Sequence, residues 1–343
     1  MKNKLILLVY TTLMSASLLF AQSEYKILNR IHLDGDGGWD YLTVDEATNR
    51  LFVSHGTMVQ VVDLSTGMLA GTIPDLKGVH GVAIAGNLNK AFISCGRDSS
   101  VVVVDLKTLK FMAKVKVTGA NPDAILYDPY SHKVLTYNGG SANATVLDAK
   151  TLKVVETIPL DGKPEFSVTD GEGKIYVNNE DKNMVYVINA KTLKVEQKWS
   201  ITPGEEPTGL AIDKVKHRLF SVTDKQMIIL DSETGKVVAN VPIGERVDGV
   251  VFDPGKKRAY SSNGEGSVTV VEEVNENEFR VVETITTQPG ARTIGINTKT
   301  HRIYLSTAEF GPTPEPTIEN PKPRSTIKPG TFTVLEIGYS KGF

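Results

Sequence analysis

The sequence predicts an all-β fold, a seven-bladed β-propeller, because one strand pattern recurs with a fixed period and the two chain ends complement each other. A basic residue, an apolar strand and small polar residues at its end occur together seven times in the 343 residues. Successive copies begin 40, 43, 41, 44, 40 and 44 positions apart, and a period of this length with strand-like content is typical of a β-propeller. The copies are Arg50–His55, Lys90–Cys95, Lys133–Asn138, Lys174–Asn179, Arg218–Thr223, Arg258–Asn263 and Arg302–Thr307.

Each repeat divides into four short β-rich runs, as expected for a four-stranded blade. In the unit 166–201 these runs are Phe166–Thr169, Lys174–Asn178, Val185–Ile188 and Val195–Ile201. The third run of most repeats is almost continuously apolar, which is typical of strands covered on both faces. Stacked blades would cover them in this way, so the sequence places the core between the blades.

The two ends of the chain predict how the ring closes. The last repeat has only three strands, and the last of them covers Phe332–Ile337. Tyr25–Leu33 matches the fourth-strand pattern of Leu152–Leu160, so residues 24–33 should complete the last blade. This closure removes the exposed sheet edges that would otherwise pair with other chains.

The last repeat also contains a proline-rich insert over residues 308–331. The acidic residues that end the last two third strands, Glu272 and Glu336, are 64 positions apart, whereas the earlier steps are 41 to 43. Six prolines in the insert favour an extended conformation that lacks backbone hydrogen bonds. We expect a strap that acts as a lid or docks a partner, with a disordered insertion as the alternative.

The N-terminus predicts a secretory signal peptide over residues 1–21. Lys2 and Lys4 precede the apolar run Leu5–Phe20, and Ala21 supplies a small residue for cleavage. The run is shorter than the roughly 20 residues that a membrane span needs, so export is favoured over the alternative, a retained anchor. We therefore expect a periplasmic or secreted chain, residues 22–343, that forms a single domain without a membrane span.

Composition limits the partners of the mature chain. Without Lys2 and Lys4, 36 basic residues face 40 acidic residues, a net charge of −4. This balance gives no reason to expect nucleic acid or an anionic membrane as a partner. Cys95 is the single cysteine, so the fold has no internal disulfide and depends on burial. We expect a monomer that binds a small molecule or a protein.

The sequence resembles the YVTN-repeat, YncE-like family of seven-bladed β-propellers. The tetrapeptide of the family name is present as Tyr176-Val177-Asn178-Asn179, and the resemblance covers the whole mature chain. It implies the propeller fold but no single activity, because these repeats are structural. Related propellers include lactone hydrolases and a streptogramin-type lyase, whose catalytic motifs have no residue-by-residue counterpart in this sequence.

Chain direction divides the loops between two faces. The loop before the first strand and the loop between the second and third strands lie at one end, the top face. His132, His217 and His301 belong to turns of the opposite, bottom face, and we interpret them as structural. Carboxylates and imidazoles gather at the top face, where they could bind a divalent cation or a cationic ligand. The ligand-binding candidates are Trp39, Asp40, His55, His80, Arg97, Asp123, Asn138, Glu165, Asn178, Asp248, Asn263 and Arg292.

Metal and catalytic candidates are fewer. Aspartates alternate with glycines in the stretch 34–40, which resembles the start of a calcium loop and makes Asp34, Asp36 and Asp40 candidate metal ligands. A glycine-rich connecting loop is the alternative interpretation. His55 and His80 are the candidate acid–base residues, and no G-x-S-x-G, H-E-x-x-H, phosphate-binding loop or CxxC motif occurs.

Two functional hypotheses follow. The first is an exported propeller that binds a small ligand or a protein partner at its top face. The second is a lyase or a lactone hydrolase, with or without assistance from a divalent cation, that acts at the same central pocket.

Overall fold

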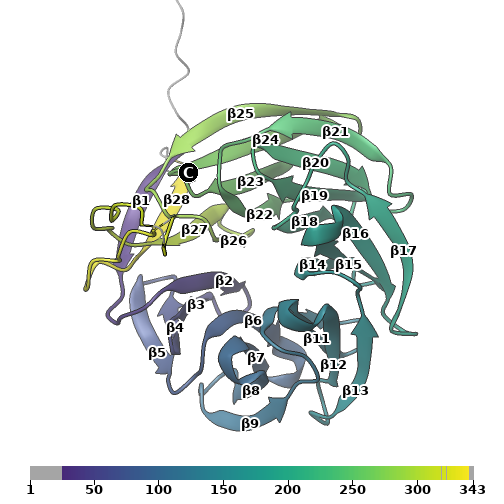
Figure 1. Cartoon of the computed structure of the whole chain (residues 1–343), viewed down its shortest axis with the longest axis horizontal. Coiled ribbons are helices and arrows are strands. Elements are labelled where there is room, and N and C mark those ends of the chain that lie inside the picture. The colour runs from purple at the N-terminus through teal and green to yellow at the C-terminus, as the bar shows by residue number, and fades with distance from the viewer. Residues whose placement is uncertain (1–24, 318, 322, 340–343) are drawn as a thin grey trace, which may run out of the picture.

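Seven four-stranded antiparallel sheets form a closed ring, which confirms the predicted seven-bladed β-propeller (Figure 1). This computed structural model describes residues 25–317, 319–321 and 323–339, and the predicted signal peptide lies outside these residues. Within the described residues, no helix is long and apolar enough to cross a membrane.

The first four blades follow the chain from the central channel outward. Blade 1 contains β2 (Trp39–Asp45), β3 (Arg50–His55), β4 (Met58–Asp63) and β5 (Met68–Ile73); blade 2 contains β6 (Val79–Ala85), β7 (Lys90–Cys95), β8 (Ser100–Asp105) and β9 (Phe111–Lys116). Blade 3 contains β10 (Pro122–Asp128), β11 (Lys133–Asn138), β12 (Asn143–Asp148) and β13 (Val154–Pro159); blade 4 contains β14 (Pro164–Thr169), β15 (Lys174–Asn179), β16 (Met184–Asn189) and β17 (Lys194–Ser200).

The last three blades continue in the same order. Blade 5 contains β18 (Leu210–Asp213), β19 (Arg218–Thr223), β20 (Gln226–Asp231) and β21 (Val237–Pro242); blade 6 contains β22 (Val247–Asp253), β23 (Arg258–Asn263), β24 (Ser267–Asn275) and β25 (Glu278–Thr286). Blade 7 contains β26 (Ile294–Asn297), β27 (Arg302–Thr307), β28 (Thr333–Tyr339) and β1 (Tyr25–His32). The described residues also form four short 3₁₀ helices. η1 (Gly86–Leu88) connects β6 to β7, whereas η2 (Gly96–Asp98), η3 (Gly139–Ser141) and η4 (Glu180–Lys182) follow the second strands of blades 2, 3 and 4.

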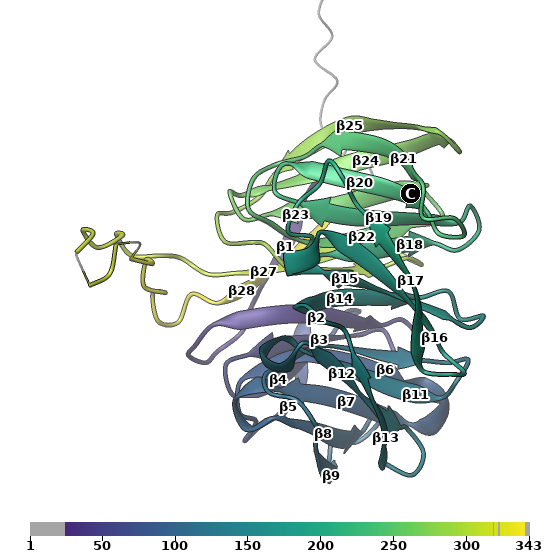
Figure 2. The same cartoon turned by 45° about the vertical axis from the view of Figure 1, so that its right-hand side comes forward.

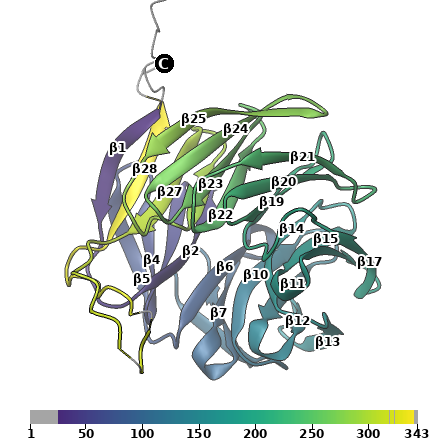
Figure 3. The same cartoon turned by 45° about the horizontal axis from the view of Figure 1, so that its top comes forward.

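The N-terminal strand closes the ring as predicted. β1 pairs antiparallel with β28, from Tyr25 opposite Tyr339 to His32 opposite Thr333, and Figure 3 shows the two strands side by side. The amide of Leu33 extends the pairing by donating to the carbonyl of Phe332 at 3.2 Å. Blade 7 is therefore built from both ends of the chain.

The hydrophobic core lies between neighbouring blades. The third strands are buried almost throughout, as the apolar third runs predicted, because each is covered by the blade before it and the blade after it. Val61 of blade 1, for example, belongs to the same buried cluster as Ile93 and Val102 of blade 2. The first strands surround a central channel of about 470 Å³.

The first strands are irregular where they enter the blade. The pairing of β2 with β3 shifts between Trp39 and Leu42, and β6, β10, β14 and β22 shift at corresponding places. An irregularity of this type re-aims the side chains beside it. The side chains at the top of each first strand therefore do not follow simple in-and-out alternation.

The proline-rich insert forms an arm between β27 and β28 that projects beyond the ring (Figure 2). We name the described residues between 308 and 331 the arm. Its two limbs are paired near the base, because Phe310 bridges Ile327, Gly311 donates to the carbonyl of Thr326 at 2.8 Å, and Lys328 donates to that of Glu309 at 2.8 Å. The arm is thus better hydrogen-bonded at its base than its proline content predicted, and it extends outward instead of lying flat as a strap.

Candidate functional site

One residue of each blade reaches the mouth of the central channel at the top face. It lies at the second position of the first strand in five blades, and just before that strand in blades 5 and 7. We name these aligned residues the mouth ring. They are Asp40, His80, Asp123, Glu165, Thr208, Asp248 and Arg292.

Three blades bring an imidazole and two carboxylates together. His80 Nδ1 lies 2.6 Å from Asp40 Oδ2 and 3.3 Å from Asp123 Oδ1. All three side chains are largely buried, with 19 to 24% of each exposed. A single N–H cannot fully serve two carboxylates, so this cluster has unused capacity to accept a hydrogen bond or to bind a cation.

Burial and the neighbouring charges shift the pKa values of His80 and Asp123 in this cluster. Burial opposes protonation of His80, but the hydrogen bond to Asp40 and the charge of Asp123 outweigh it and raise the imidazole pKa above its usual value. Burial raises the pKa of Asp123 to about 6, against the opposing charge of His80. The ionised form of Asp123 is therefore unfavourable without a nearby positive charge.

The other mouth residues form ion pairs around two cations, first Lys163 and second Arg292. Lys163 Nζ lies 2.6 Å from Glu165 Oε1 and also contacts Glu180. Burial raises the pKa of Glu165 to about 8, and its hydrogen bond with Glu180 adds to this effect. Five carboxyl groups, those of Asp40, Asp123, Glu165, Glu180 and Asp248, therefore lie at the mouth, and the two cations paired with them are Lys163 and Arg292. Arg246 also lines the adjoining cavity.

Asp248 and Arg292 form the second of these pairs. The Arg292 guanidinium contacts the Asp248 carboxylate directly. Burial nevertheless raises the pKa of Asp248 to about 6, assisted by the charges of Asp40 and Asp123. Ionised Asp248 is therefore unfavourable even beside an arginine.

Two aromatic rings lie below the mouth ring. Tyr41 and Phe166 are 5.3 Å apart between ring centroids, and both line the central channel. Burial, followed by the charges of Asp123 and Asp40, raises the pKa of Tyr41 well above its ordinary value. The phenol thus stays protonated, and aromatic rings beside carboxylates form a surface that suits an organic cation.

Asp40, His80 and Asp123 are also the residues best placed to hold a metal ion. One ligand atom from each lies within 4.8 Å of the others, and no other such group occurs in the described part of the chain. Of the predicted metal ligands, Asp40 belongs to this group and Asp34 and Asp36 do not. The Asp34 side chain is 99% exposed and lies 3.4 Å from His32.

His55 lies inside its blade, away from the cluster of His80. Its side chain is fully buried, its ring stacks on Phe332 at 3.9 Å between centroids, and its Nδ1 lies 2.9 Å from Gln60 Oε1. Burial lowers the pKa of this imidazole. The described contacts do not join the two histidines, so they do not form one acid–base pair.

The other predicted ligand-binding residues occupy different environments. Asn138, Asn178 and Asn263 are fully buried, and their amides bond to neighbouring strands or blades, for example Asn178 to the carbonyl of Gly209 at 2.9 Å. Arg97 is exposed on η2. Trp39 packs against Phe310 of the arm and against Phe332.

The surroundings of Cys95 and of the three bottom-face histidines give no indication of a catalytic role. Cys95 is fully buried, and burial raises its pKa, which disfavours a thiolate nucleophile. His301 Nδ1 lies 2.7 Å from the buried Asp253 carboxylate, and His132 Nδ1 lies 3.1 Å from the Tyr127 hydroxyl. His217 is exposed.

Sequence reasoning missed Tyr41, Phe166, Lys163 and Glu180. An alignment of the seven first strands would have shown the mouth-ring residues as one column. Tyr41 and Phe166 directly follow that column in blades 1 and 4. Lys163 and Glu180 come from the loop before β14 and from η4, which chain direction places at the same face, but the sequence gives no signal that these two side chains meet.

Comparison with known proteins adds a distant relationship. The chain is 22% identical over 226 residues to an uncharacterized protein YncE of Salmonella typhimurium, a match that covers 61% of this chain and 63% of that protein. It is 22% identical over 222 residues to antigen Lp49 of Leptospira interrogans, which covers 60% of this chain and 48% of that protein. These matches span less than two thirds of the relatives' length, and no protein-family profile matches the chain.

Solved structures share the fold. A chain of the Kuenenia stuttgartiensis hydrazine synthase has a TM-score of 0.69 at 16% identity, covering 80% of this chain and 94% of that one. A chain of the mitotic checkpoint complex has a TM-score of 0.74 at 11% identity, covering 89% of this chain and 96% of that one. At such identities the likeness shows the fold alone.

The fold and the mouth define the class as a seven-bladed β-propeller with ionisable residues around its channel. The distant relatives named YncE support the expected resemblance to YncE-like seven-bladed β-propellers.

Proposed function

We propose that this protein is an exported propeller that binds a small cationic ligand at the mouth of its central channel. The observation that carries the proposal is the gathering of five carboxyl groups at the mouth, with which only Lys163 and Arg292 form the ion pairs described above. The raised pKa values of Asp123, Glu165 and Asp248 support it, because a bound cation would stabilise their ionised forms.

Two kinds of cation fit the mouth. The cluster of Asp40, His80 and Asp123 offers the mixed nitrogen and oxygen ligands that Zn²⁺ and Mn²⁺ accept. The rings of Tyr41 and Phe166, close to carboxylates, suit an organic ammonium group. A divalent cation and an organic cation share the same requirement for negative charge, and the experiment separates them.

Calorimetric titration with ZnCl₂, MnCl₂ and choline tests the proposal. We expect Asp123→Asn to weaken binding at least about tenfold, because one of few charged partners is lost. His80→Gln should weaken metal binding and leave choline binding nearly unchanged. His217→Ala, a substitution of an exposed histidine on the bottom face, is the control and should change neither.

Cation affinity should rise with pH. Protons compete with the cation for Asp123 and Asp248, with pKa values of about 6, and for Glu165, with a pKa of about 8. Affinity should therefore increase between pH 5 and pH 8, as these groups lose their protons. Absence of heat from all three probes at pH 8, or equal affinity in Asp123→Asn, would refute a cation site.

A catalytic function at the same pocket is the second candidate. Asp40 orients His80 through a 2.6 Å contact, which is the arrangement of a general base with its supporting carboxylate. A lyase or lactone hydrolase would use His80 in this role, with or without a divalent cation. Turnover of a lactone or ester probe that His80→Gln abolishes would favour this activity over simple binding.

The arm is proposed to contribute to ligand or partner capture. A cavity of about 900 Å³ lies between the arm and the mouth, lined by Phe310 and Arg324 on one side and Trp39 and Arg292 on the other. Replacing residues 309–330 with a short glycine-containing turn should preserve the fold, since six blades have short connections at this position.

The shortened chain should bind ligand more weakly, while its melting temperature should stay within a few degrees of that of the intact chain. Removing only residues 314–324 is the matched control, because the paired base at Phe310 and Ile327 remains. Unchanged binding in both shortened chains would leave the arm without a role at this site.

Export is part of the same proposal. The predicted signal peptide over residues 1–21 supports delivery to the periplasm or the medium. The intact mass of the chain recovered from these fractions tests it, since cleavage after Ala21 leaves a chain that begins at Gln22. A chain recovered with its N-terminus uncleaved would contradict export by this route.

A further inference from the structure

An acidic residue of blade 6 occupies a position that other blades fill with leucine, alanine or serine. The position is defined by one backbone hydrogen bond at the bottom face, from the end of the third strand to the turn before the second strand. We name it the junction slot. It is occupied by Leu64, Leu106, Ala149, Ala190, Ser232 and Glu273, whose amides donate to the carbonyls of Asn49, Asn89, His132, Gly173, His217 and Lys257 respectively.

The slot faces the preceding blade. Leu106 of blade 2 belongs to the same buried cluster as Val61 of blade 1, and Ala190 of blade 4 belongs to that of Val146 of blade 3. Glu273 is 6% exposed, so a carboxyl group is buried where the other blades bury small or apolar side chains. Burial of a carboxyl group is unfavourable unless it is neutral or paired.

Neither carboxyl oxygen of Glu273 has a hydrogen-bond partner among the described residues. The side chain lies at one wall of a bottom-face cavity of about 400 Å³, together with Lys216, Lys257 and the turn of the β24–β25 hairpin. Asp213 of blade 5 is 4% exposed and accepts a hydrogen bond from the amide of Lys216, which lines the same cavity, and its carboxyl group interacts with that of Glu273. Two buried carboxyl groups thus meet at this junction.

Other junctions place a donor opposite the corresponding carboxylate. Asp128 of blade 3 accepts from the Thr169 hydroxyl of blade 4 at 2.6 Å, and Asp253 of blade 6 lies 2.7 Å from His301 Nδ1 of blade 7. Asp213 occupies the aligned position in blade 5, at the end of the first strand. Only a protonated Glu273 could donate to it in the same way.

We propose that Asp213 and Glu273 hold one proton between them, and that loss of this proton loosens the bottom of the junction between blades 5 and 6. Protonated Glu273 donates its O–H to an Asp213 oxygen, as Thr169 does to Asp128. When the proton leaves, two buried carboxylates repel each other, and the junction becomes sensitive to pH.

The charged groups around the pair do not remove the need for this proton. Arg218 is engaged by Asp231 and by the carbonyl of Glu276, and Lys216 lies 3.5 Å from the Glu276 carboxylate. Lys257 is exposed at the cavity. Burial and, after it, the neighbouring Asp213 carboxyl group raise the pKa of Glu273 to about 7, although Arg218 and Lys216 oppose the shift.

The direction of the pH effect follows from this shift. Between the ordinary pKa of a glutamate and about pH 7, the folded chain keeps a proton that the unfolded chain has lost. Stability from this pair is therefore greatest in acid and declines as the pH rises through 7. A group with a lowered pKa would give the opposite slope.

Thermal melting of the full mature chain between pH 5.5 and pH 8.5 tests the proposal. The melting temperature of the unsubstituted chain should fall by about 5 °C more than that of Glu273→Gln, whose amide can donate to Asp213 at every pH. Asp213→Asn should flatten the profile in the same way. Glu309→Gln, with a side chain 61% exposed on the arm, is the matched control and should leave the profile unchanged.

Amide hydrogen exchange shows which part of the junction between blades 5 and 6 loosens. Exchange over residues 274–278, corrected for its intrinsic pH dependence, should accelerate above pH 7 in the unsubstituted chain and stay constant in Glu273→Gln. Parallel melting profiles of these two chains would overturn the proposal. Recovery of the melting temperature at pH 8.5 on addition of CaCl₂ would also overturn it, because the pair would then hold a metal ion.

Discussion

Removal of β1 is expected to abolish cooperative folding of the ring. Tyr25, Ile31 and Leu33 are each buried to 2 to 4% exposure, and burial of three such side chains contributes about 5–8 kcal/mol. This is comparable to the whole free energy of unfolding of an ordinary domain, about 5–15 kcal/mol. Loss of β1 also leaves β28 as an unpaired edge.

Hydrogen bonds at the end of the strand add to this closure. The Tyr25 hydroxyl lies 2.7 Å from that of Tyr260 in blade 6 and donates to that of Tyr339 at 2.9 Å. β1 therefore connects blade 7 to blade 6 as well as completing its own sheet. No disulfide can substitute for these contacts, because Cys95 is the single cysteine.

Circular dichroism of a chain that begins at residue 34 measures the effect, and a synthetic peptide of residues 24–33 should restore part of the lost signal. Point variants cover the case in which the shortened chain does not fold. Ile31→Ala should cost about 2–4 kcal/mol, whereas Leu28→Ala, on the same strand but 42% exposed, should cost much less. A shortened chain that melts within a few degrees of the intact chain would show that closure is not needed.

The fold could be predicted because the sequence pattern that specifies it repeats along the chain. Seven copies of one strand pattern identify the blades, and the second strands begin and end where the sequence predicted, for example Lys174–Asn179 for β15. The matching pattern at Tyr25–Leu33 also identified the closing strand. Such features repeat many times, so a local error in one copy does not change the architecture.

The mouth was harder to predict because it is formed by side chains and strand irregularities that depart from the repeat pattern. Asn138, Asn178 and Asn263 lie at or next to the top ends of second strands, but their amides form hydrogen bonds within and between blades. Tyr41 and Phe166 reach the channel through the irregular start of the first strands, which alternation does not reveal. Chain direction gave the correct face but not the orientation of each side chain.

The hairpin of blade 6 that lies beside the bottom face of blade 5 also departs from the repeat pattern. β24 and β25 have nine residues each, whereas the third strands of blades 1 to 5 have six, so this hairpin extends beyond the blade. Its turn covers Arg218, which opens β19 in the same way that Lys133 opens β11. The two basic residues look equivalent in the sequence and differ in burial only because of this neighbouring hairpin.

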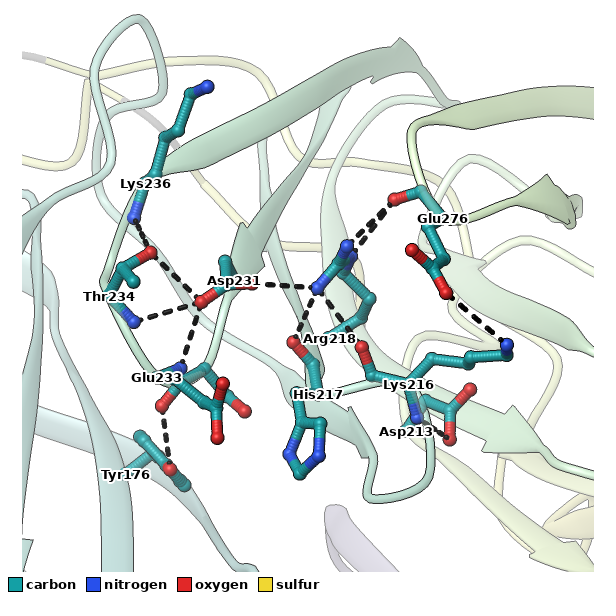
Figure 4. A network of polar contacts seen from close by, with 11 residues as sticks. Tyr176, Asp213, Lys216, His217, Arg218, Asp231, Glu233, Thr234, Lys236 and Glu276 are labelled. Carbon is teal, nitrogen blue, oxygen red and sulfur yellow. Dashed lines mark hydrogen bonds and ion pairs between the residues drawn. The ribbon is translucent and has the colours of Figure 1, made fainter.

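Arg218→Ala is expected to be the most destabilising substitution of a charged residue on this face. The guanidinium is 7% exposed, and Figure 4 shows it between the Asp231 carboxylate, at 2.8 Å, and the carbonyl of Glu276, which accepts two hydrogen bonds of 3.0 Å. It also donates to the carbonyls of Lys216 and His217. Removing one partner of a buried pair costs about 3–5 kcal/mol, because the acceptors are left without a donor.

Urea unfolding distinguishes this prediction from a general effect of losing a surface charge. Lys133→Ala removes the aligned basic residue of blade 3, whose 2.9 Å pair with Asp148 is 23% exposed on both sides, and should cost about 1 kcal/mol or less. Arg218→Lys keeps the charge but not the planar set of donors, so its cost should lie between the two. Equal costs for Arg218→Ala and Lys133→Ala would mean that the hairpin adds nothing. A larger cost for Arg218→Ala would show that the long turn of blade 6 secures blade 5 through this one side chain.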